Sequence, residues 1–163
     1  MFDINQFKDL IIAPALNDLN LYSDDAVELL VFTCAAESAG GTYLHQKKGV
    51  ALGVYQCEPA TYQDIWVNYI FRNYAIMSRL QLNFNVVNIP EPERLVYDLR
   101  FASAICRIHY RRVPDELPSK DDVNGMWDYY KKFYNTEKGK AKKEACLKAY
   151  EKFSGVSLSS SNG

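Results

Sequence analysis

The sequence lacks several features that would assign it to a class directly. Its 163 residues contain no apolar run long enough to span a bilayer. The first residues, Met1–Asn5, lack the basic and apolar pattern of a secretion signal. The formal net charge is only -1, which argues against the strong basic field used to bind nucleic acid or anionic membranes. We therefore expect a chain made in a cytoplasm, with no membrane span and no nucleic-acid partner.

Cysteine and histidine are too scattered for a metal site. The four cysteines form no Cys-x-x-Cys pair and have no zinc-finger spacing to a histidine; they are Cys34, Cys57, Cys106 and Cys146. We predict reduced, packed thiols, no metal and no cofactor. His109 falls on an apolar helical stripe and is predicted to be a packed core histidine, which disfavours a Cys–His hydrolase.

Apolar residues and tyrosine are plentiful. Hydrophobic residues make up 48% of the chain, enough for the core of one domain. Twelve tyrosines exceed the eight phenylalanines. A tyrosine surplus suits a carbohydrate groove, which needs flat apolar faces and hydroxyls, but it equally suits half-buried helix faces.

Apolar residues recur mostly at helical spacing, which predicts a mainly α bundle of about six to eight helices. Glycines punctuate residues 41–58, where a small loop or β-excursion is expected. We predict one long helix from Leu95 to His109, and a lysine-rich exposed helix face at Lys138, Lys140, Lys142 and Lys143. One domain over residues 1–153 and a flexible tail over 154–163 complete the expected organisation.

Glu37 does not fit a structural role. It shares a helical stripe with Ala26, Leu30 and Thr33, and it lies near the helix C-terminus, where the dipole disfavours negative charge. Both placements favour a protonated carboxyl, which is what a glycosidase needs to protonate a departing sugar oxygen. The alternative is an exposed glutamate at a frayed helix end, or one paired with a neighbouring lysine.

The residues after Glu37 form an ordered block. Glu37-Ser38 is followed by a loop and then by Gly49-Val-Ala-Leu-Gly53-Val-Tyr55-Gln56-Cys-Glu-Pro59-Ala-Thr61. This block resembles the soluble lytic transglycosylase signature, a Glu-Ser pair followed by Gly-Ala-x-Gly-Leu-Met-Gln-x-x-Pro-x-Thr. One extra residue separates the two glycines, and Tyr55 stands where the family has methionine.

The resemblance implies an α+β lysozyme-like catalytic domain in which the 41–58 segment flanks the cleft. Glu37 would be the catalytic residue, and the substrate-binding residues would be Ser38, Gln56, Tyr55 and Tyr134, the last from a partial echo of the family's Tyr-Asn segment. The loop would be shaped by Gly49, Gly53, Pro59 and Thr61. The implied substrate is the β-1,4 bond between N-acetylmuramic acid and N-acetylglucosamine in bacterial peptidoglycan.

Three functions remain open at this point. A lytic transglycosylase would use Glu37 as acid and then as base, giving a 1,6-anhydro product. A muramidase, or lysozyme, would add water, often with a second carboxylate, for which the candidates are Glu58, Asp64 and Asp98. A non-catalytic glycan-binding or structural virion protein is the third. The resemblance suggests a bacteriophage origin and action on the cell wall, either virion-associated among other virion proteins or released as an endolysin.

Overall fold

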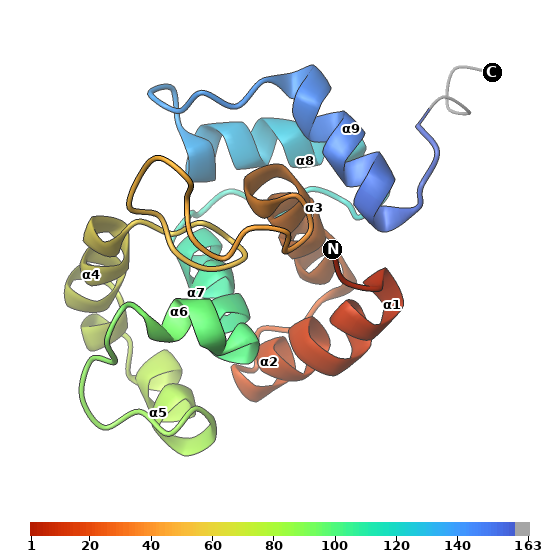
Figure 1. The fold of residues 1–163 in the computed structure, drawn as a ribbon. Helices are drawn as coiled ribbons and strands as arrows, with labels where there is room; N and C mark the ends of the chain where they lie inside the picture. The colour runs from red at the N-terminus through yellow and green to blue at the C-terminus, as the bar shows by residue number, and fades with distance from the viewer. Residues whose placement is uncertain (159–163) are drawn as a thin grey trace.

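The computed structural model describes residues 1–158 and is mostly helical, which confirms the predicted mainly α bundle (Figure 1). The predicted tail falls partly on residues 159–163, which lie outside the described residues. No helix within residues 1–158 is both long and apolar enough to cross a membrane. The elements are α1 (Ile4–Gln6), η1 (Phe7–Ile12), α2 (Ala13–Asp18), α3 (Asp24–Ser38), α4 (Pro59–Asn68), η2 (Ile70–Arg72), α5 (Tyr74–Asn83), α6 (Arg94–Tyr97), α7 (Leu99–Arg111), α8 (Val123–Tyr130), η3 (Lys131–Asn135) and α9 (Lys143–Ser154).

Helix α3 is the buried centre of the bundle. Every residue from 26 to 35 is buried. Helices α7, α8 and α9 and the N-terminal η1 pack around α3 (Figure 1). Its N-terminus is capped by Ser23, whose hydroxyl accepts the backbone N–H of Ala26 at 3.0 Å. A helix that is buried on all sides is stable only when other helices cover it, so the packing around α3 fixes the position of the side chains in its last turn.

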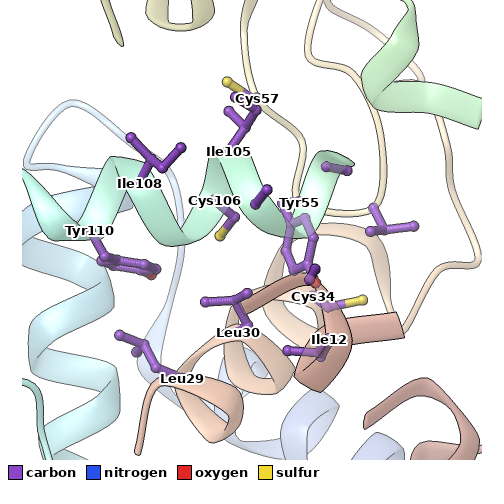
Figure 2. Packing of buried hydrophobic residues seen from close by; sticks show 14 of the residues in the cluster. Ile12, Leu29, Leu30, Cys34, Tyr55, Cys57, Ile105, Cys106, Ile108 and Tyr110 are labelled. Carbon is purple, nitrogen blue, oxygen red and sulfur yellow. The ribbon is translucent and has the colours of Figure 1, made fainter. Parts of the chain in front are cut away.

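The core joins segments that are distant in sequence. Figure 2 shows Leu29, Leu30 and Cys34 of α3 together with Ile105 and other residues of α7, with Tyr55 coming from the loop between α3 and α4. The four cysteines are buried and free, as predicted. Burial raises the pKa of both Cys34 and Cys57 to about 12, so neither thiol is an activated nucleophile.

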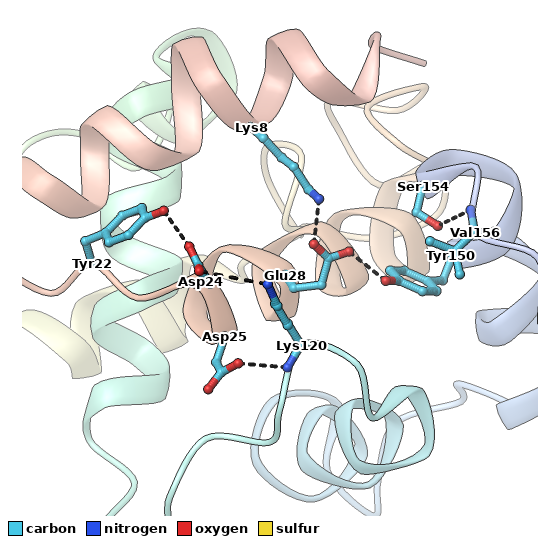
Figure 3. Close-up of polar contacts among 9 residues, drawn as sticks. All are labelled: Lys8, Tyr22, Asp24, Asp25, Glu28, Lys120, Tyr150, Ser154 and Val156. Atoms are coloured by element: carbon cyan, nitrogen blue, oxygen red, sulfur yellow. Dashed lines mark hydrogen bonds and ion pairs between the residues drawn. The ribbon is translucent and has the colours of Figure 1, made fainter.

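A glutamate buried in the bundle is fully paired. Glu28 of α3 is 8% exposed and accepts a hydrogen bond from the Tyr150 hydroxyl at 2.6 Å, while the Lys8 ammonium lies 2.6 Å from its other oxygen (Figure 3). The three groups come from α3, α9 and η1. Because an unpaired buried carboxylate is costly, the three groups tie these elements together in one arrangement.

Two expectations about the helices are wrong. The helix predicted from Leu95 to His109 is broken at Asp98, whose extended backbone and side chain cap α7 by accepting the backbone N–H of Phe101 at 3.0 Å. The lysine-rich segment is not a helix face, because residues 136–142 form a loop and α9 begins only at Lys143. Thr136, with a φ of 66°, ends the preceding helical stretch.

The loop between α3 and α4 contains the expected β-excursion. Leu52 forms antiparallel bridges with both His45 and Cys57, so the chain folds back on itself twice. Gly53 adopts a φ of +78°, and a Cβ atom there would clash with the backbone carbonyl group of Leu95 in α6. Both the backbone conformation and the close approach require glycine at this position.

We predict that Gly53→Ala lowers the free energy of unfolding by about 2–5 kcal/mol, because it adds a left-handed conformation penalty to a clash with backbone. Urea denaturation followed by circular dichroism measures the loss. Gly155→Ala is the matched control, since Gly155 has a φ of +75° and an added Cβ atom would meet nothing within 4 Å. We expect it to cost about 1 kcal/mol, the conformational penalty alone. Equal losses in the two variants would contradict the packing argument.

Candidate active site

Glu37 lies in the last turn of α3 and faces a cleft. The Tyr130 hydroxyl, from the end of α8, donates a hydrogen bond to Glu37 Oε1 at 2.7 Å. Burial raises the pKa of Glu37 from 4.5 to about 7, and the Tyr130 hydrogen bond partly offsets this increase by stabilising the carboxylate. The side chain is therefore divided between acid and carboxylate near neutral pH, in line with the expectation from its place in the sequence.

The cleft beside Glu37 has a volume of about 660 Å³, within the usual range for small-molecule sites. One side is the end of α3 with the β-excursion and the start of α4, and the other is the end of α8, η3 and the loop after it. Its lining residues are Ala36, Glu37, Gln46, Ala51, Gln56, Cys57, Glu58, Thr61, His109, Tyr130, Tyr134, Asn135, Thr136, Lys138, Gly139, Lys140 and Ala141.

Four of the predicted site residues meet in this cleft: Glu37, Gln56, Thr61 and Tyr134. Gln56 has a φ of 48°, and its side-chain Nε2 donates to the Gly53 carbonyl at 2.9 Å. That bond stabilises the turn that brings Gln56 to the cleft. Pro59 is the first residue of α4, where a missing N–H is tolerated, so it starts the helix that carries Thr61.

Two predicted substrate-binding residues do not reach the cleft. Ser38 is fully buried; its hydroxyl donates to the Cys34 carbonyl at 3.1 Å and accepts the Gly41 N–H at 3.0 Å. It therefore closes the C-terminus of α3 and does not line the cleft. Tyr55 is 2% exposed, and its hydroxyl pairs with Ser103 at 2.7 Å within the core. The prediction that these two residues contact substrate is wrong.

Gly49 has a smaller role than Gly53. It lies on the exposed part of the loop without a positive φ, and a Cβ atom there would clash with the Gln46 side chain. Gln46 in turn accepts the Ala51 N–H at 3.2 Å. Gly49 therefore leaves room for a flexible side chain that braces the loop, which agrees with the loop-shaping role expected for it.

The tyrosine that contacts Glu37 is Tyr130 and not Tyr134, the residue that the motif suggested. Tyr134 donates instead to the Tyr55 carbonyl and stacks on His109, with ring centroids 4.7 Å apart. The two tyrosines are four residues apart and stack at 6.0 Å, so both face the same side of the chain. The i, i+4 spacing of these two tyrosines in the sequence is the pattern that could have predicted their shared side.

His109 packs as a neutral ring and also lines the cleft. Burial, helped by the charge of Arg112, lowers the pKa of His109 to about 4. The expectation of a packed histidine holds for its burial, but its contribution to the cleft was not foreseen. At neutral pH it is uncharged and does not stabilise ionised Glu37.

Of the three candidates for a second carboxylate, only Glu58 lines the cleft. Asp64 pairs with Arg112 at 2.8 Å and accepts a hydrogen bond from Asn68, and these bonds lower its pKa. Asp98 caps α7 and pairs with Arg94 at 3.0 Å. The last two carboxylates are therefore committed to structural contacts, and Glu58 is the one available beside Glu37.

Metal-ligating residues do not gather anywhere in the described chain. Among residues 1–158, no group of three or more His, Cys, Asp or Glu side chains is arranged to hold a metal ion.

Comparisons with known proteins identified no relative of this chain. No protein-family model matches the chain, and searches of curated proteins and of solved structures found no match. Support for a function therefore comes from the residues of the cleft and from the resemblance of the Glu37 block.

Burial of Glu37 predicts a pH-dependent stability. The unfolded carboxyl ionises near 4.5 and the folded one near 7, so unfolding becomes easier as pH rises between these values, by about 3 kcal/mol in total. The Glu37→Gln variant has no ionisable group at this position, so it lacks this pH-dependent loss of stability. We expect its unfolding free energy, relative to wild type, to rise by about 3 kcal/mol from pH 4.5 to pH 7. Urea unfolding at a series of pH values measures this, and Glu58→Gln controls for the loss of one cleft carboxylate. The same pH trend in both variants would refute the burial argument.

Tyr130→Phe tests the hydrogen bond to Glu37. Loss of a donor to the carboxylate disfavours the charged form, so we expect the pKa of Glu37 to rise further, by about one pH unit. A carbon-13 NMR titration of the glutamate carboxyls measures it. Tyr134→Phe removes a hydroxyl from the same cleft that bonds to Tyr55 instead, and it should leave the Glu37 titration nearly unchanged. A shift of equal size in both variants would mean that the 2.7 Å contact is not its cause.

Proposed function

We propose that this protein cleaves the β-1,4 bond between N-acetylmuramic acid and N-acetylglucosamine in peptidoglycan, with Glu37 as the proton donor. The observation that carries the proposal is a carboxyl with a pKa of about 7 beside a cleft of about 660 Å³. A general acid works best when its pKa lies near the operating pH. The resemblance of the Glu37 block to lytic transglycosylases supplies the substrate.

The proposed reaction begins with transfer of the Glu37 proton to the linking oxygen as positive charge grows on the anomeric carbon. The resulting carboxylate is stabilised by the Tyr130 hydroxyl, which is already in hydrogen-bonding position. Glu37 then accepts a proton from the nucleophile, and the enzyme returns to its starting state. A pKa of about 7 lets one residue serve both steps.

The identity of the nucleophile distinguishes a lytic transglycosylase from a muramidase. If it is the sugar's own 6-hydroxyl, the product is a 1,6-anhydro sugar and no second carboxylate is required. We favour this lytic transglycosylase reaction because the motif resembles that family. The muramidase alternative has one specific observation in its favour, which is that Glu58 lines the same cleft and is exposed to an incoming water.

The setting of the reaction rests on the resemblance alone. We propose action on the bacterial cell wall, with a bacteriophage origin and either virion delivery or release as an endolysin. Binding of glycan without cleavage, as in a structural virion protein, is the rival that the first activity assay separates.

Glu37→Gln and Glu58→Gln form a matched pair for testing the chemistry. Clearing of purified sacculi by wild type should fall about 100-fold to 10,000-fold in Glu37→Gln, because the amide cannot donate or accept the proton in the same way. Glu58→Gln should retain most activity if the 6-hydroxyl attacks. A large loss in Glu58→Gln with reducing-end products by mass spectrometry would assign the muramidase reaction.

Control measurements separate a loss of catalysis from a loss of folding. Both variants should keep the circular dichroism spectrum of wild type, since each change is nearly isosteric. No release of muropeptides by wild type, or equal release by wild type and Glu37→Gln, would eliminate the proposed mechanism. Binding of sacculi without release would support the structural alternative.

A further inference from the structure

Two lysines line the cleft on the side opposite the β-excursion. Lys138 and Lys140 lie on the loop between η3 and α9, and both are exposed and contribute to the cleft lining. No ion pair joins either of them to a carboxylate within residues 1–158. Lys142 and Lys143 belong to the same lysine-rich run but do not line the cleft.

The loop that carries these lysines has a defined backbone. Lys131 of η3 donates to the Asn135 side chain at 2.6 Å and to the Gly139 carbonyl at 3.0 Å, directly between the two cleft lysines. The Thr136 carbonyl also accepts the Gly139 N–H at 3.1 Å, which closes a turn. These bonds hold the backbone of the turn from which both lysine side chains extend, which lowers the entropic cost of binding a ligand there.

These lysines do not act on the proton donor. The pKa of Glu37 is raised by burial and lowered by Tyr130, with no contribution from Lys138 or Lys140. A cation near the carboxyl would have lowered that pKa, so the two ammonium groups lie elsewhere along the cleft. A neutral glycan offers no charge to pair with them, whereas a carboxylate on the substrate does.

We propose that Lys138 and Lys140 form a subsite for a carboxylate carried by the glycan substrate. The inference rests on the proposed function, in which the glycan is peptidoglycan. Two sources have this chemistry: the lactyl carboxylate of unsubstituted muramic acid, and the carboxylates of an attached stem peptide. Either source distinguishes the bacterial wall from a neutral polymer of N-acetylglucosamine.

Binding measurements in the Glu37→Gln background test the subsite without cleavage of the ligand. Three probes are titrated by calorimetry at low salt: chitohexaose, which is neutral; glycan strands stripped by an amidase, which expose the lactyl carboxylate; and glycan strands with uncrosslinked stem peptides. The test variant is Lys138→Gln with Lys140→Gln. The matched control is Lys142→Gln with Lys143→Gln, which removes the same charge from outside the cleft.

We expect the test variant to weaken binding of an anionic strand by about fivefold to tenfold, the effect of two exposed ion pairs. The control pair should change it less than about twofold, and chitohexaose affinity should be equal in all forms. Loss confined to stripped strands assigns the lactyl carboxylate, and loss confined to stem-bearing strands assigns the peptide. Salt should reduce the difference between test and control.

Unchanged affinity for both anionic strands, or an equal loss for chitohexaose, would overturn the subsite. Its failure is distinct from failure of the proposed reaction. If wild type cleaves sacculi and the lysine variant cleaves them with the same kcat/KM, the reaction stands and the subsite falls. If wild type cleaves nothing but binding of anionic strands depends on Lys138 and Lys140, the subsite stands and the reaction falls.

Discussion

The 2.7 Å contact between the Tyr130 hydroxyl and Glu37 joins α8 to α3, which lie on the two sides of the cleft, and the proposed chemistry depends on it. Burial alone would push Glu37 further toward the neutral form and make its carboxylate a costly species. The hydroxyl offsets part of that cost only while α8 remains packed against α3. The proton affinity of Glu37 therefore depends on how α8 packs against α3.

The packing that maintains this contact lies away from the cleft. Helix α3 is surrounded over residues 26–35, and its one internal charge, Glu28, is held by Lys8 and Tyr150 from two other helices. Tyr150 also packs against Phe32 of α3, with ring centroids 5.4 Å apart, and Phe32 packs against Tyr130 at 5.6 Å. A continuous set of contacts therefore runs from the Glu28 cluster through Phe32 to the partner of Glu37.

The sequence predicted the helical class from the spacing of apolar residues, and it predicted the burial of Glu37 because this carboxylate lies on an apolar stripe. It mispredicted Ser38 because consecutive residues on a helix point about 100° apart, so the neighbour of a cleft residue faces elsewhere. It mispredicted Tyr55 because a motif fixes order along a loop but not which side chains turn inward. The spacing of charges places Lys138 and Lys140 on a helix because it does not reveal the positive φ of Thr136 that ends η3.

The free cysteines described with the core have a consequence for where the fold can persist. Disulfide exchange and oxidation proceed through the thiolate, and a pKa of about 12 keeps both Cys34 and Cys57 as neutral thiols at neutral pH. Cys34 is also fully buried and out of reach of dissolved oxidants, whereas Cys57 lines the cleft. The Cys34 sulfur at the centre of the bundle is therefore poorly reactive toward oxidants, so a change of surroundings from reducing to oxidising would leave the packing of α3 around it intact.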